Sequence, residues 1–182
     1  MIKKLILILI LLFSTVEKSF PGQFEDFDNL DSHTGYWIGF GFGSNYFGIT
    51  ISGNLNLALN ENIFSVRYAK SDEFRFNVEG HYDEPARGLK EFVLLYGRYL
   101  KKDNFVLRLS TGISFLSGIN RGRNIEYQEF ERISISTLGL PLEGEFIIGF
   151  SKNIGISLLC YGNLNKDKTF GGVVFKLNAG LF

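Results

Sequence analysis

The stretch FGITISGNLNLAL, residues 47–59, decides the fold, because apolar side chains recur at alternate positions along it. The apolar set is Phe47, Ile49, Ile51, Leu55, Leu57 and Leu59, with Gly53 among them. The positions between them carry small or polar residues, from Gly48 to Ala58. A period of two is typical of a β-strand whose two faces differ in chemistry. We therefore predict a strand with the whole apolar set, Phe47 included, on one face.

The same alternation runs from Thr34 to the end of the chain and predicts eight strands. The alternating segments are 36–43, 47–59, 64–69, 89–100, 105–115, 138–150, 154–161 and 173–181. Segment 89–100 is apolar at both parities, so its facing is ambiguous. We predict Val93, Leu95 and Tyr99 on its apolar face, because that choice puts Arg98 on the polar face.

The predicted connections alternate between short and long. Tight turns fall at 60–62, 101–104 and 151–153, and longer connections at 80–88, 120–132 and 165–169. Only the first hairpin, near 43–45, breaks this rhythm. Short periplasmic turns and longer external loops are the layout of an outer-membrane barrel. The sequence thus predicts an all-β fold, an eight-stranded antiparallel up-and-down transmembrane β-barrel over residues 34–182.

A soluble, lipocalin-like barrel would alternate in the same way, with its apolar face inside, and this alternative stays open on pattern alone. The composition of the two faces favours lipid outside. The polar face is rich in Gly, Ser, Asn and Ala, which suits a lumen only wide enough for side chains. The opposite face carries large aliphatic and aromatic groups, which in water would exceed the patch that a soluble monomer tolerates. We expect this face to contact lipid.

The first 33 residues have a different character. Two lysines and then nine apolar residues, 5–13, open the chain, which is typical of a secretory signal peptide and too short for a membrane-spanning helix. We expect a signal peptide over 1–22 and a flexible periplasmic lead-in over the acidic segment 23–33. Export followed by insertion predicts an outer-membrane location.

The overall composition excludes several classes of function. The chain has 19 basic and 19 acidic residues, whereas nucleic-acid binding needs a clustered basic surface. One cysteine and two histidines cannot make an intramolecular disulfide or a histidine-rich metal site. The sequence predicts no cofactor and no metal.

Residues 34–182, with their period-two strands and a final strand 171–182 that ends in Phe182, resemble the small Gram-negative outer-membrane β-barrel proteins of the OmpA/OmpX type. The resemblance implies a monomer that contacts outer-membrane lipid. It also implies that the last strand is read by the barrel-assembly machinery. Phe182 departs from the usual spacing, because it has the parity of Lys176 and Asn178 rather than of Phe175.

Charged residues at the polar parity predict a network in the lumen. Its members are Arg67, Arg98, Arg108, Glu143 and Glu145, joined by Glu91 or Lys176. Enclosed charges must pair, because an isolated ion out of water is costly. Such a network either fills the barrel as a salt-bridged plug or forms a polar pore or gate, and we favour the plug on lumen size. Glycines 39, 41 and 43 are expected to leave gaps for the long arginines.

Two external connections carry further candidates. In 120–132, Arg121, Arg123 and Tyr127 could bind a surface ligand or lipopolysaccharide phosphates, or belong to an ordinary solvated loop. A hydrolytic site at His81, with Asp83 and Glu84, is the enzymatic alternative. Cys160 is expected to face lipid. The leading interpretation is a non-enzymatic barrel with a structural, envelope or surface-loop binding role. A narrow channel and a lipid-modifying enzyme are the alternatives.

Overall fold

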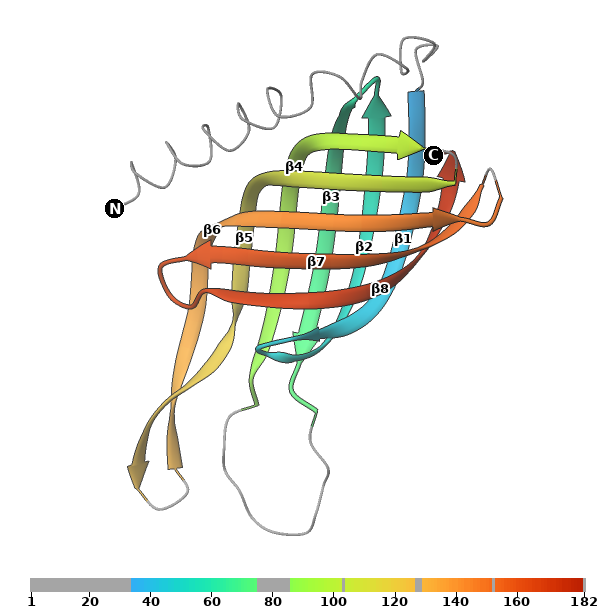
Figure 1. The fold of residues 1–182 in the computed structure, drawn as a ribbon. Helices are drawn as coiled ribbons and strands as arrows, with labels where there is room; N and C mark the ends of the chain where they lie inside the picture. The colour runs from blue at the N-terminus through green and yellow to red at the C-terminus, as the bar shows by residue number, and fades with distance from the viewer. Residues whose placement is uncertain (1–33, 75–85, 103, 127–128, 152, 182) are drawn as a thin grey trace. The chain divides into compact units, whose positions relative to one another are not determined.

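The computed structural model describes residues 34–74, 86–102, 104–126, 129–151 and 153–181. These residues form eight strands, coloured in chain order in Figure 1. The strands are β1 Thr34–Asn45, β2 Gly48–Leu59, β3 Asn62–Asp72, β4 Gly88–Lys102, β5 Phe105–Glu126, β6 Glu129–Gly149, β7 Ile154–Asn165 and β8 Phe170–Leu181. No helix in the described ranges is long and apolar enough to cross a membrane. The segments predicted as signal peptide and lead-in lie outside these ranges, as does Phe182.

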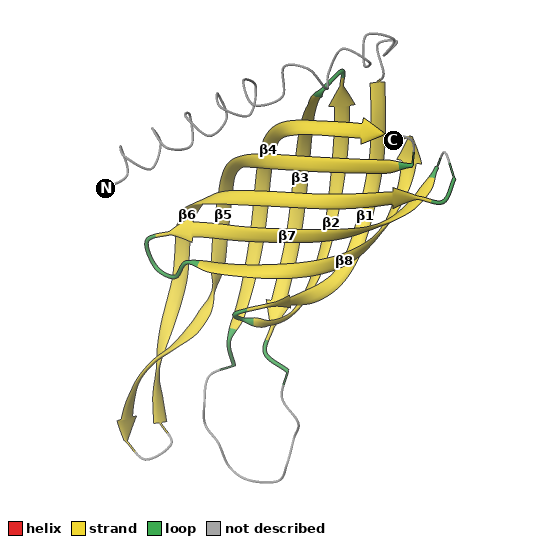
Figure 2. Cartoon of the chain, in the orientation of Figure 1, coloured by secondary structure: helices red, strands yellow, loops and turns green. Residues whose placement is uncertain are grey.

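Each strand pairs antiparallel with the next along the chain, and β1 pairs with β8 to close the barrel. Figure 2 shows that the described part of this barrel is built from strands and short connections. Closure gives every strand a partner on both sides, so no sheet edge is left along the wall. The predicted all-β, up-and-down barrel is confirmed.

The strands are staggered as they go around the wall. A row of directly paired residues that starts at Thr34 meets β1 again at Ser44, ten residues further on. Between these two ends the row passes through Leu59, Asn62, Arg98, Leu109, Gly144, Cys160 and Val173. A stagger of this kind tilts the strands and leaves an interior that side chains can fill.

The two faces of the wall differ as the alternation predicts. Large apolar side chains on all of these strands point outward, and Phe40 and Phe175 are 66% and 70% exposed. The residues between them point into the lumen and are mostly buried, as the alternating burial along β2 and β3 shows. A continuous apolar outer band is what a lipid bilayer requires of a barrel.

The facing predicted for β4 is wrong. Paired residues lie on the same face of a sheet, and Arg98 pairs with Leu109, which is exposed on the outer band. Val93, Leu95 and Tyr99 are buried in the lumen instead. Arg98 forms an ion pair with Glu61 in the adjacent turn, which satisfies its charge near the end of the strand without entering the lumen.

Two further predictions need correction. Phe47 is 1% exposed and lies inside the barrel, because β1 continues to Asn45 and the turn is at 46–47, after the position expected for the first hairpin. The segment 120–132 is strand rather than loop for most of its length. β5 continues through Glu126 and β6 begins at Glu129, with register shifts between Arg121 and Glu126.

Candidate functional site

The middle of the lumen holds a chain of alternating charges. Glu91 on β4 binds Arg67 on β3 at 2.9 Å, and Arg67 also binds Glu143 on β6 at 2.6 Å. From there the chain passes to Arg108 on β5 at 2.7 Å, to Glu145 on β6 at 2.9 Å, and to Lys176 on β8 at 2.6 Å. Three cations and three carboxylates therefore alternate in one connected network, which we call the ionic layer.

Neutral donors and acceptors add further hydrogen bonds to the ionic layer. Asn163 donates to Glu91 at 2.6 Å, and Ser157 donates to Glu145 at 2.6 Å. Arg108 donates to Asn56 and to Ser65, each at 3.0 Å. The Arg67 guanidinium also lies 4.6 Å from the centre of the Tyr161 ring. These contacts add residues of β2 and β7 to the layer. The layer therefore connects strands on several sides of the barrel wall.

The burial of the ionic layer explains why its charges balance. Arg67, Arg108 and Glu145 are 0% exposed, and a charge removed from water must be paired and hydrogen-bonded. The glycines of β1 make room for it, because a side chain at Gly39 or Gly41 would collide with Lys176. The space beside Gly39 and Gly41, which was predicted to hold arginines, is therefore occupied by Lys176.

The structure brings four of the five predicted lumen residues together. Arg67, Arg108, Glu143 and Glu145 belong to the ionic layer with both Glu91 and Lys176, whereas Arg98 lies outside. The neutral members of the ionic layer were not predicted from the sequence. Asn56, Ser157 and Asn163 had only the inward parity of their strands to mark them.

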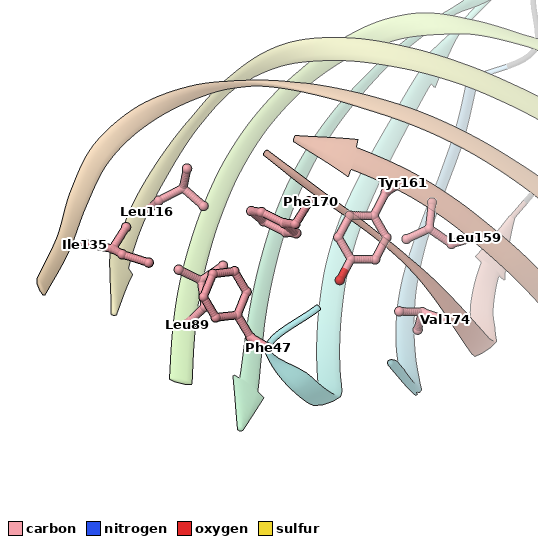
Figure 3. Close-up of a cluster of buried hydrophobic side chains, with 8 residues drawn as sticks. All are labelled: Phe47, Leu89, Leu116, Ile135, Leu159, Tyr161, Phe170 and Val174. Carbon is pink, nitrogen blue, oxygen red and sulfur yellow. The ribbon is translucent and has the colours of Figure 1, made fainter. Parts of the chain in front are cut away.

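Apolar clusters occupy the lumen on both sides of the ionic layer. At the end where β1 begins, the cluster is Trp37, Ala58, Ile63, Tyr99, Val106 and Ile147. Toward the other end it is Phe47, Leu89, Leu116, Ile135, Leu159, Tyr161, Phe170 and Val174 (Figure 3). The rings interlock edge to face, with centroids 6.4 Å apart for Trp37 and Tyr99 and 5.4 Å apart for Phe47 and Phe170. The ionic layer therefore lies between two apolar clusters in the described lumen.

A second cluster of charges lies at the rim where β3 ends and β4 begins. Glu73 accepts hydrogen bonds from Arg87 at 3.0 Å and from Arg121 at 2.6 Å. The hydrogen bond to Glu73 raises the pKa of Arg87 above its ordinary value. The Tyr46 ring contacts two cations, with its centre 5.5 Å from Arg87 and 4.3 Å from Lys168.

Arg121 also lies 5.9 Å from the centre of the Phe130 ring. We call this cluster the cationic rim; two of its cations bind one carboxylate and the third lies against Tyr46, and its members are Tyr46, Glu73, Arg87, Arg121, Phe130 and Lys168. It joins the turns and strand ends of the whole rim.

The other external candidates have mixed outcomes. Arg123 lies on β5 and is exposed. Tyr127 and the proposed catalytic trio of His81, Asp83 and Glu84 lie outside the described residues. Within the described ranges no group of three or more His, Cys, Asp or Glu side chains could hold a metal ion. Cys160 is exposed on the outer face of β7, as expected.

Comparison with solved structures is informative about the fold. The N-terminal β-barrel domain of Pseudomonas aeruginosa OprF matches with a TM-score of 0.56 at 10% sequence identity, over 83% of this chain and 100% of that one. Ail, the attachment invasion locus protein of Yersinia pestis, gives 0.54 at 12% identity, over 84% and 100% of the two chains. The fold is that of the small eight-stranded outer-membrane barrels.

Neisserial surface protein A matches with a TM-score of 0.54 at 11% identity, over 80% of this chain and 94% of that one. Ail has also been solved in complex with the heparin analogue sucrose octasulfate. No family model matches the sequence, and a search of the curated proteins finds no match. Sequence identities this low support a shared fold and no shared role. Any role of the rim and the lumen therefore rests on their own residues.

Proposed function

We propose that the protein is a surface-binding barrel of the outer membrane, in which the filled barrel is a rigid anchor and the cationic rim binds anionic saccharide groups outside the cell. The observation that carries the proposal is the rim itself. Arg87 and Arg121 share the Glu73 carboxylate there and Lys168 lies against the Tyr46 ring, so these four charged groups together carry a net positive charge toward an incoming anion.

The geometry of β5 and β6 supports presentation at the cell surface. β5 pairs with β4 only as far as Ile119, and β6 pairs with β7 only from Gly139. Beyond these points the two strands pair with each other alone, through Asn124 and Phe130 to Glu126 and Glu129. Figure 1 shows this hairpin extending past the neighbouring strands. A two-stranded extension gives Arg121, Arg123 and Phe130 a stiffer support than a loop would.

The filled lumen favours an anchor over a channel. A conducting path would have to separate ions that are bonded in one neutral chain, and to open apolar clusters at both sides of it. Breaking a buried pair costs about 3–5 kcal/mol, which makes spontaneous opening rare. The proposed activity therefore resides in the rim and not in the lumen.

Sulfated sugars are suitable probes because Ail was solved with one. We expect sucrose octasulfate to bind the detergent-purified protein, with an affinity that falls as salt is raised. Combining Arg121→Gln with Lys168→Gln should weaken binding by about tenfold or more, because charge-assisted hydrogen bonds contribute about 1.5–3 kcal/mol each. Titration calorimetry measures both effects.

The control variant is Lys102→Gln, which removes an exposed cation from the opposite end of the barrel, where β4 ends. It should leave the affinity unchanged. Equal losses in the Lys102 and rim variants would assign binding to net charge and not to the rim, and absence of binding by the wild-type protein would refute the proposal.

A further inference from the structure

A groove on the outer wall leads to the cationic rim. It runs across β1, β2 and β3 and has a volume of about 880 Å³. Its apolar part is lined by Ile38, Phe40, Ile51, Leu55, Val66 and Tyr68. Its other end is lined by Lys70, Asp72, Glu73 and Phe74. Because Glu73 is also a member of the rim, the groove and the rim form one continuous surface, apolar at one end and charged at the other.

The apolar part is a slot, because one side chain is missing from a row of large ones. Gly53 pairs with Phe40 on one side and with Tyr68 on the other. The strands that carry these two rings lie on either side of β2, so they are about 9–10 Å apart. A single hydrocarbon chain is narrower than this slot. Because the slot lies within the lipid-facing band, an acyl chain is the group available to fill it.

The charged end of this surface favours an anion. The Lys70 ammonium lies 2.6 Å from the Asp72 carboxylate. Glu73 binds Arg87 at 3.0 Å and Arg121 at 2.6 Å. These three cations and two carboxylates leave one net positive charge where the groove meets the rim. An anionic group is therefore attracted to this end, whereas a neutral group is not.

The cations of the rim are spread over several connections. Arg87 and Lys168 contact the same Tyr46 ring, at 5.5 Å and 4.3 Å from its centre. Arg121 contacts the Phe130 ring, at 5.9 Å from its centre. These three cations lie before β4, before β8 and on β5, so they come from three parts of the rim. A head group with several anionic groups on a sugar framework matches this spread better than the single phosphate of a phospholipid.

We propose that the groove and the cationic rim together bind a lipid-linked anionic saccharide, which is an acylated sugar that carries phosphate groups in the outer leaflet of the same membrane. One acyl chain occupies the slot over Gly53, and the phosphates contact Arg87, Arg121 and Lys168. The inference rests on the proposed function, because the rim binds the head of this ligand. The slot adds a preference for the acylated form of the sugar, which the rim alone does not provide.

Native mass spectrometry of the membrane-extracted protein tests the site. The protein is exchanged into micelles that contain equal amounts of lipid A, an acylated and bisphosphorylated disaccharide, and of phosphatidylglycerol, an anionic phospholipid. We expect lipid A to stay bound in preference to phosphatidylglycerol. Gly53→Leu, which fills the slot, should lower the retention of lipid A by about fivefold or more, because about ten carbon–carbon contacts are lost.

Gly144→Leu is the matched control for the slot. Gly144 also points outward, and its added Cβ would meet only Leu109, at 3.6 Å. This variant should retain lipid A as the wild type does. Wild-type retention of lipid A in Gly53→Leu, or an equal loss in Gly144→Leu, would overturn the slot as part of the site. Equal retention of the two lipids by the wild type would overturn the assignment of the ligand as a saccharide.

Sucrose octasulfate, which has no acyl chain, separates this inference from the proposed function. Gly53→Leu should bind it as the wild type does, which also shows that the variant is folded. Combining Arg121→Gln with Lys168→Gln should weaken the binding of both ligands by about tenfold or more. Loss of sucrose octasulfate but not of lipid A in that variant would overturn the shared site and leave the proposed function standing. Absence of sucrose octasulfate binding by the wild-type protein would refute the proposed function, and this inference with it.

Discussion

Replacing Glu143 with alanine is expected to destabilise the folded barrel by about 3–5 kcal/mol, the cost of removing one partner from a buried ion pair. Glu143 accepts from Arg67 at 2.6 Å and from Arg108 at 2.7 Å. Its loss leaves two buried guanidinium groups with a deficit of negative charge at the centre of the ionic layer. The measurement is urea unfolding in lipid vesicles, followed by the shift in gel mobility that marks folded barrels.

Glu61→Ala provides the control for this effect. Glu61 also pairs with an arginine, Arg98, but both side chains are about half exposed, at 53% and 45%. An exposed pair contributes about 0–1 kcal/mol. Similar losses in the two variants would mean that the ionic layer is hydrated and not sealed.

Replacing Gly43 with valine is expected to prevent closure of the barrel. A Cβ at Gly43 would collide with the Val173 carbonyl oxygen and would lie 2.7 Å from the Val174 Cα, both of which are backbone atoms of β8. Backbone cannot move aside as a flexible side chain can, so β1 and β8 must separate where they close the wall. We expect a loss of about 3 kcal/mol or more, at the upper end of the range for overpacking.

Gly144→Val is the matched substitution, since the space at Gly144 is open toward Leu109. It should fold with nearly wild-type yield. Protease resistance of the membrane fraction reports closure in both variants. A protected Gly43→Val barrel would show that the β1–β8 seam is looser than this register implies.

The strands and their facing could be predicted wherever the two parities differ in chemistry. β2 shows this well, because Leu55 and Leu57 alternate with Asn54 and Asn56. The rule fails on β4, whose inward face meets the apolar cluster around Trp37 and Tyr99. Both faces of that strand are then apolar for different reasons, lipid on one side and lumen packing on the other, and parity alone cannot tell them apart.

The charged residues of the lumen could be predicted, because the need of enclosed charges to pair also explains why they balance. A narrow barrel forces its inward ionic groups to pair, so inward parity was enough to group Arg67, Arg108, Glu143 and Glu145. The apolar clusters were harder to foresee, although Val106 already broke the polar pattern of β5. Of the cationic rim, the sequence pointed only to Arg121, because Tyr46, Glu73 and Lys168 come from other connections and are brought near it by the folding of the barrel.

The amino-acid composition of residues 120–132 did not predict that β5 and β6 continue as a hairpin. Mixed charges and glycine in 120–132 are typical of loops, yet the two strands continue to pair across this segment. Backbone hydrogen bonds between the strands hold it, with irregular register near Asn124. Pairing of this kind depends on the neighbouring strand and leaves little trace in the local sequence.

The side of the wall that faces lipid can be measured at the chain's one cysteine. Cys160 is exposed on the outer face of β7, between its partners Gly144 and Val173. A fluorophore attached there in reconstituted vesicles should be quenched by nitroxide-labelled phospholipids and not by aqueous iodide. Lys102→Cys in a Cys160→Ser background supplies the water-exposed reference. Quenching of the Cys160 probe by iodide, without quenching by the labelled lipid, would contradict the assignment of the apolar band to the bilayer.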